Sequence, residues 1–233
     1  MIAVMAQPPQ AEAKPSDLGL RLLSSIVLIP PVIAAIHFGS PYFDALAIVG
    51  GLTLVYEVHS ASGRRLGWTV GGAVYVALAV IALISLRGTS AEATGALTMY
   101  WMFVLIWAAD STAYFVGRGI GGPKLAPRIS PKKTWSGFCG ALLGAGIIGA
   151  ALAFYLEKTD IWPLILWSAA LGGVGQGGDL LESWFKRRFD RKDMSGLIPG
   201  HGGLFDRVDG LLAVAIACWI GQVALGKALL AWL

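Results

Sequence analysis

Charged residues are scarce in this sequence. Only 14% of its 233 residues are charged, whereas soluble domains carry about 25%. Hydrophobic residues make up 56%, and the mean hydropathy is +0.68. Because a helix needs about 20 apolar residues to cross the hydrocarbon core, the chain has room for about seven crossings and for no separate soluble domain. The sequence therefore predicts an all-α, polytopic transmembrane bundle of about seven helices, within a range of roughly six to nine.

Cysteine and histidine are also rare, which excludes several kinds of site. Cys139 and Cys218, the 2 cysteines, lie in apolar stretches and form no CxxC pair, so we expect small buried apolar side chains rather than a disulfide framework. With 3 histidines, the chain offers too few ligands for a zinc site. The glycine-rich run 173–177 lacks the lysine of a Walker loop and is interpreted as close helix packing.

Long apolar runs separated by polar turns fill most of the chain. The expected helices are 18–38, 41–60, 67–86, 96–117, 134–156, 160–186 and 204–232. We expect residues 1–17 to form a cytoplasmic tail and residues 18–233 to form a single transmembrane catalytic domain.

The basic residues are distributed unevenly between the two sides of this predicted bundle. Of the 18 Lys and Arg residues, only Arg87, Lys158 and Lys227 fall opposite the side that carries the N-terminus. Since cytoplasmic loops are enriched in Lys and Arg, this distribution predicts a cytoplasmic N-terminus and an odd number of crossings. The expected location is a bacterial-type inner (cytoplasmic) membrane, with the charged loops on the cytoplasmic side.

A few carboxylates fall inside the predicted membrane segments, where ionisable groups usually mark function. They are Glu57, Asp110, Asp179, Glu182, Asp206 and Asp209. Asp179, Glu182, Ser183 and Lys186 share one helix face at this spacing. For Glu182 and Lys186, a simple intrahelical ion pair explains the pattern equally well, whereas Asp179 lies deeper, beside two glycines, and favours a functional role.

A second polar run, residues 201–209, begins the last predicted helix. Asp206 and Asp209 are three residues apart and can point the same way. One carboxylate would suffice to cap a helix N-terminus, so the pair favours a site for Mg²⁺, which prefers oxygen ligands and bridges to phosphates. His201 precedes them and is interpreted as a metal-adjacent residue, a phosphate donor or a plain loop histidine.

The loop 117–134 contains five basic residues and no acidic one. Contact with anionic lipid explains Lys124 and Arg128. Ser130, Lys132, Lys133 and Thr134 combine hydroxyl and ammonium groups at a helix start, where phosphate binding is favoured. Acidic metal ligands beside basic phosphate-binding groups indicate metal-assisted transfer at phosphorus, with one substrate from the cytoplasm and one from the bilayer.

At these residues the chain resembles the phosphatidate cytidylyltransferase (CDP-diacylglycerol synthase) family. The C-terminal signature of that family corresponds to Ser183, Lys186-Arg187, Lys192-Asp193 and the run Pro199-Gly200-His201-Gly202-Gly203-Leu204-Phe205-Asp206-Arg207-Val208-Asp209. Further similar blocks are 110–118, 129–137 and 178–183. The resemblance is strong over residues 100–215, and the N-terminal hundred residues match only as membrane helices.

The resemblance implies transfer of the cytidylyl group of CTP to phosphatidic acid, with Mg²⁺ and with a second cation left open. It implies that Asp179, Asp206 and Asp209 bind the metal. It implies catalytic roles for Asp179, Asp206, Lys186, Arg187, His201 and Ser183. It implies substrate binding by Ser130, Lys132, Lys133, Thr134, Arg118, Tyr114 and Arg207.

Several alternatives stay open from the sequence. A CTP-dependent polyprenol kinase, or a cytidylyltransferase for another membrane lipid, would share the metal and phosphate groups and differ in its acceptor. A transporter would spread its charges along a path through the bilayer, whereas here they lie toward one side. The expected partners are CTP and phosphatidic acid, with no nucleic acid. Faces of small residues suit a homodimer and intrachain packing equally well.

Overall fold

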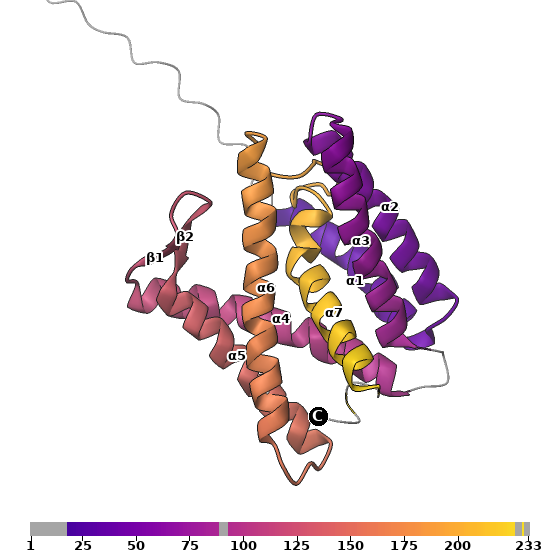
Figure 1. Cartoon of the computed structure of the whole chain (residues 1–233), viewed down its shortest axis with the longest axis vertical. Helices are drawn as coiled ribbons and strands as arrows, with labels where there is room; N and C mark the ends of the chain where they lie inside the picture. The colour runs from indigo at the N-terminus through magenta and orange to yellow at the C-terminus, as the bar shows by residue number, and fades with distance from the viewer. Residues whose placement is uncertain (1–17, 89–92, 227–229, 231–233) are drawn as a thin grey trace, which may run out of the picture.

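The computed structural model describes residues 18–88, 93–226 and 230. Within them the chain forms seven α-helices and one short β-hairpin (Figure 1). The elements are α1 (Leu18–Phe38), α2 (Tyr42–Ala61), α3 (Leu66–Arg87), α4 (Ala93–Ile120), β1 (Lys124–Ala126), β2 (Ser130–Thr134), α5 (Trp135–Tyr155), α6 (Trp162–Arg188) and α7 (Phe205–Leu225). The predicted all-α fold is confirmed, and each expected apolar segment contains one helix. The last helix was expected to reach residue 232, but α7 ends at Leu225, where Gly226 adopts a left-handed conformation as its C-cap. The predicted tail, residues 1–17, lies outside the described residues.

Membrane insertion agrees with the length and surface of these helices. Among the described residues, α3, α4, α5 and α7 are long and apolar enough to cross a bilayer. Large apolar side chains also face outward, including Ile26 on α1 (68% exposed) and Leu143 on α5 (67% exposed). Such surface is stable when lipid rather than water covers it. The chain is therefore a multi-pass membrane protein.

Close helix packing gathers the last four helices around α6. Helix α5 packs between α4 and α6, and α7 packs against both α6 and α3, while α2 lies against the far side of α3 (Figure 1). Gly172 of α6 shows how near the backbones come, because a Cβ there would lie 2.9 Å from the carbonyl oxygen of Ala141 on α5. This agrees with the interpretation of the glycine-rich segments as packing surfaces.

The basic loop before α5 is more ordered than the sequence predicted. It forms an antiparallel hairpin in which Lys124 pairs with Thr134 and Ala126 with Ser130. The Thr134 side chain then accepts a hydrogen bond from the Gly137 amide (3.1 Å) and caps α5. The hairpin therefore fixes the side chains of β2 next to α4 and α6. No alternating pattern in this part of the chain is strong enough to predict a pair of strands this short.

Two further residues differ from expectation. Cys218 is buried as expected, but Cys139 lies on an exposed face of α5 because its neighbours Gly137 and Gly140 take the positions that pack against α4. Arg87, which was expected only as a charge at a membrane surface, is buried. Its guanidinium donates to the carbonyl oxygens of Ile36 (2.6 Å) and His37 (3.2 Å) and so joins the ends of α3 and α1.

Candidate active site

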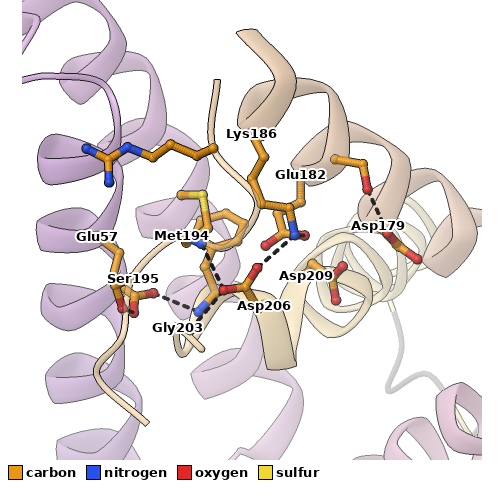
Figure 2. Close-up of polar contacts among 12 residues, drawn as sticks. Glu57, Asp179, Glu182, Lys186, Met194, Ser195, Gly203, Asp206 and Asp209 are labelled. Atoms are coloured by element: carbon orange, nitrogen blue, oxygen red, sulfur yellow. Dashed lines mark hydrogen bonds and ion pairs between the residues drawn. The ribbon is translucent and has the colours of Figure 1, made fainter. Parts of the chain in front are cut away.

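Carboxylates from two helices meet where α6 ends and α7 begins. Asp179 and Glu182 come from α6 and Asp209 from α7, and one oxygen of each lies within 4.8 Å of the others (Figure 2). The i,i+3 spacing places Asp179 and Glu182 on one face of α6. Asp209 reaches them because α6 and α7 are in close contact at Gly178. The cluster lies among apolar segments, where unpaired carboxylates are costly.

The cluster fits a divalent cation. Its ligands are all oxygens, which suits Mg²⁺. The Oε2 atom of Glu182 is paired with Lys186, but its Oε1 atom is buried and has no hydrogen-bond partner among the described residues. A buried carboxylate oxygen without a donor is unfavourable, and a cation bound by Asp179, Glu182 and Asp209 would satisfy it.

Asp206 lies beside this cluster but makes other contacts. Its Oδ1 atom is 2.7 Å from the ammonium of Lys186, and its Oδ2 atom accepts hydrogen bonds from the amides of Met194 (2.9 Å) and Gly203 (2.8 Å) (Figure 2). Lys186 also pairs with Glu182 at 2.6 Å. Asp206 therefore holds a lysine and a loop in this structure, and its predicted role as a metal ligand stays a prediction.

A second chain of contacts joins the hairpin to α6 and α4. Lys133 of β2 lies 2.6 Å from the carboxylate of Asp179 and donates to the side-chain oxygen of Gln176 (2.8 Å). Gln176 donates in turn to Asp110 of α4 (2.9 Å), and Ser183 donates to Asp179 (3.2 Å). Predicted residues separated widely in sequence are thus brought together. Gln176 was missed, and its only signal was a polar side chain within a glycine-rich membrane helix.

Two other basic residues of the hairpin, Lys124 and Lys132, line a separate cavity. Its volume is about 380 Å³, and its lining includes Tyr114, Arg118, Lys124, Lys132 and Thr134. Lys132 and Lys133 diverge because successive side chains of a strand point to opposite faces. Arg118 donates a hydrogen bond to the Tyr114 hydroxyl (2.7 Å). The lining of the cavity therefore combines an aromatic ring with several cationic side chains.

Four further predicted residues lie at neither the carboxylate cluster nor the basic cavity. Arg187 donates to the carbonyl oxygens of Ile129 (3.4 Å) and Arg191 (3.0 Å). Ser130 begins β2 and does not line the basic cavity. His201 and Arg207 line a groove of about 440 Å³ between α1, α4 and α7, where the His201 ring is 2.8 Å from the Ser24 hydroxyl.

Substitutions at two neighbouring glycines of α6, Gly177 and Gly178, can test whether the site requires the close contact between α6 and α7. A Cβ at Gly178 would lie 2.7 Å from the carbonyl oxygen of Asp209, whereas one at Gly177 would meet nothing within 4 Å. Gly178→Ala should therefore separate the cluster, lower stability by about 1–3 kcal/mol and lower activity on the order of tenfold. Gly177→Ala is the matched control and should be neutral or slightly stabilising. Melting curves and initial rates of both proteins check this, and equal behaviour of the two variants would contradict it.

Sequence comparisons relate this chain to known proteins. The family model described as the cytidylyltransferase family matches residues 10–223. A phosphatidate cytidylyltransferase of Brucella abortus biovar 1 (strain 9-941) is 42% identical over 173 residues, which cover 74% of this chain and 63% of that protein. One of Rickettsia bellii (strain RML369-C) is 35% identical over 207 residues, which cover 86% of this chain and 88% of that protein. The matched part of this chain thus spans less than two thirds of the Brucella relative.

Proposed function

The chain belongs to the cytidylyltransferase family, and on that premise we propose that it transfers the cytidylyl group of CTP to phosphatidic acid. In this reaction an oxygen of the lipid phosphate forms a bond to the α-phosphorus of CTP. The bond from that phosphorus to the oxygen bridging to the β-phosphorus breaks, and pyrophosphate leaves. The products are CDP-diacylglycerol and pyrophosphate.

The observation that carries this proposal is the acidic cluster facing two lysines. The lipid phosphate has a second pKa of about 6, so it is largely ionised at neutral pH and needs no general base. The chemical difficulty is repulsion between two anions and the charge of the leaving pyrophosphate. Side chains that hold cations and phosphates, rather than a nucleophile and base, meet that requirement.

We assign the divalent cation, Mg²⁺, to Asp179, Glu182 and Asp209. Bound there, it would neutralise phosphate charge on the nucleotide. Lys133 and Lys186 flank the cluster at 2.6 Å from Asp179 and Glu182, respectively, and each can turn toward a phosphate. Ser183 keeps Asp179 oriented through its hydrogen bond.

CTP is proposed to lie between this cluster and the basic cavity. Lys132 and Thr134 line the cavity, while the adjacent Lys133 reaches the cluster. Arg118 supplies a further cation there, and Tyr114 supplies a ring against which a cytosine can stack. The positive charges predict that this side faces the cytoplasm, where CTP is found.

The lipid acceptor is proposed to enter through the groove between α1, α4 and α7. Its walls are apolar, and Arg207 and His201 stand in its lining, so it matches an acyl chain with an anionic head. A second groove, of about 210 Å³, lies between α3, α6 and α7. Among the described residues, its lining carries Glu182 and no cationic side chain, whereas the first groove carries Arg207, so charge favours the first groove for an anionic head.

An assay with two positions of label tests the proposed function. Purified protein in detergent receives Mg²⁺, phosphatidic acid and CTP labelled at either the α- or the γ-phosphorus. Label from the α-position should enter a CDP-lipid, and label from the γ-position should appear in pyrophosphate. Transfer of γ-label to a polyprenol would indicate a kinase instead. Absence of a labelled lipid with every phospholipid acceptor would refute the proposal.

A further inference from the structure

Glu57 is a buried carboxylate far from the sequence signature. It lies in α2, in the part of the chain that was predicted only as membrane helices, and its exposed fraction is 0%. Figure 2 shows it on the opposite side of the 194–205 segment from Glu182 and Asp179. A charge buried at this depth costs several kcal/mol unless it is well paired, so its contacts indicate why it is there.

The hydrogen bonds of its side chain within the described residues are all with the segment that leads into α7. Its Oε1 atom accepts hydrogen bonds from the Ser195 hydroxyl (2.5 Å) and the Leu204 amide (2.8 Å). Its Oε2 atom accepts one from the Phe205 amide (2.7 Å). Both oxygens are therefore used, and Glu57 faces the loop and the helix start at the same time.

Glu57 takes the place of an ordinary helix cap. The N-cap residue of α7 is Leu204, whose side chain cannot accept a hydrogen bond. The first amides of a helix have no partner within the helix, and a carboxylate near them is favoured by the helix dipole. Glu57 supplies that carboxylate from α2, so the start of α7 is fixed relative to the N-terminal helices.

Asp206 holds the same segment from the other side. It accepts from the amides of Met194 and Gly203, next to the amides that Glu57 binds. Gly203 lies between the two carboxylates, where a Cβ would be 2.7 Å from the Glu57 Oε1 atom and 3.0 Å from the Asp206 Oδ2 atom. The two carboxylates thus leave little room for a side chain at position 203, and the nearer of them is Glu57.

We propose that Glu57 is a positioning residue for the metal and phosphate site. It holds the start of α7, and through that helix it sets where Asp206 meets Lys186 and where Asp209 meets Asp179 and Glu182. Because it is fully buried, it contacts no substrate. The expected change in turnover rests on the proposed function. The effect of Glu57 on cation binding, in contrast, can be measured without turnover.

The test compares Glu57→Gln with the wild type. The amide has nearly the same shape, but its nitrogen must face the backbone N–H of either Leu204 or Phe205, so at least one hydrogen bond is lost. We expect turnover at saturating CTP and lipid to fall about tenfold and the Mg²⁺ concentration for half-maximal rate to rise several-fold. The rise in melting temperature caused by added Mg²⁺ should shrink in the same variant. Glu57→Asp should recover part of both effects.

Asp44→Asn is the matched control, because Asp44 lies on the same helix and its carboxylate contacts only Ser40 in the described residues (2.7 Å). It should leave turnover and both Mg²⁺ responses unchanged. If Glu57→Gln does not fold, Ser195→Ala removes one of the three donors to Glu57, together with the acceptor of the Leu197 amide, and should raise the Mg²⁺ requirement about twofold. A folded Glu57→Gln protein, or failing that a Ser195→Ala protein, with wild-type Mg²⁺ responses would overturn the proposal. An inactive wild type would refute the cytidylyl transfer, and the melting measurements would still decide the role of Glu57.

Discussion

Replacement of Asp179 by Asn is expected to lower the rate of CDP-lipid formation by at least about 100-fold, the scale seen when a preorganised electrostatic group is removed. Asp179 belongs to the cluster with Glu182 and Asp209 and also pairs with Lys133. The neutral amide of Asn binds a cation more weakly than a carboxylate does. It also no longer forms an ion pair with Lys133. The loss should therefore include a higher Mg²⁺ requirement, and excess Mg²⁺ should recover part of the rate.

Initial rates over a Mg²⁺ titration, at saturating CTP and phosphatidic acid, check this expectation. Asp160→Asn is the control, because Asp160 precedes the other end of α6 and accepts a hydrogen bond from the Trp162 amide, a role that Asn can also fill. Its rate should equal that of the wild type. Near-normal activity of Asp179→Asn would remove Asp179 from the metal site.

Replacement of Asp206 by Asn is also expected to cost at least about 100-fold in rate, for a different reason. Both oxygens of Asp206 are occupied, one by Lys186 and the other by the amides of Met194 and Gly203. An amide nitrogen must oppose either the ammonium or the two N–H groups. Lys186 would lose one of its two carboxylate partners, and the segment before α7 would lose an anchor.

The Mg²⁺ titration distinguishes the two roles considered for Asp206. If it acts through Lys186 and the loop, the maximal rate of Asp206→Asn falls while the Mg²⁺ requirement rises no more than in Glu57→Gln, which loosens the same segment. We expect this result. A Mg²⁺ requirement raised as in Asp179→Asn would instead make Asp206 a metal ligand, as the sequence predicted. Asp190→Asn, in the exposed turn after α6, is the control, since its positive φ of 52° suits Asn.

The sequence predicted the helices well because hydrophobicity over about 20 residues is a local property. It predicted the β-hairpin poorly, since strands of three and five residues carry too short a pattern. The sequence marked Glu57 only as one of six carboxylates inside the predicted membrane segments. In the structure, the Glu57 carboxylate accepts a hydrogen bond from the Leu204 amide, about 147 positions later in the chain.

The sequence by itself determined the membrane class, the helix faces and the contacts between residues one turn apart. Ser183 with Asp179 and Lys186 with Glu182 follow directly from 3.6 residues per turn. Only the tertiary structure decided which carboxylates share a site. Asp209 joins Asp179 and Glu182, while Asp206 turns to Lys186, because the close contact of α6 and α7 at Gly178 and the cap from Glu57 fix the position of α7. Those contacts depend on how helices pack, and packing is set by surfaces far apart in the chain rather than by local spacing.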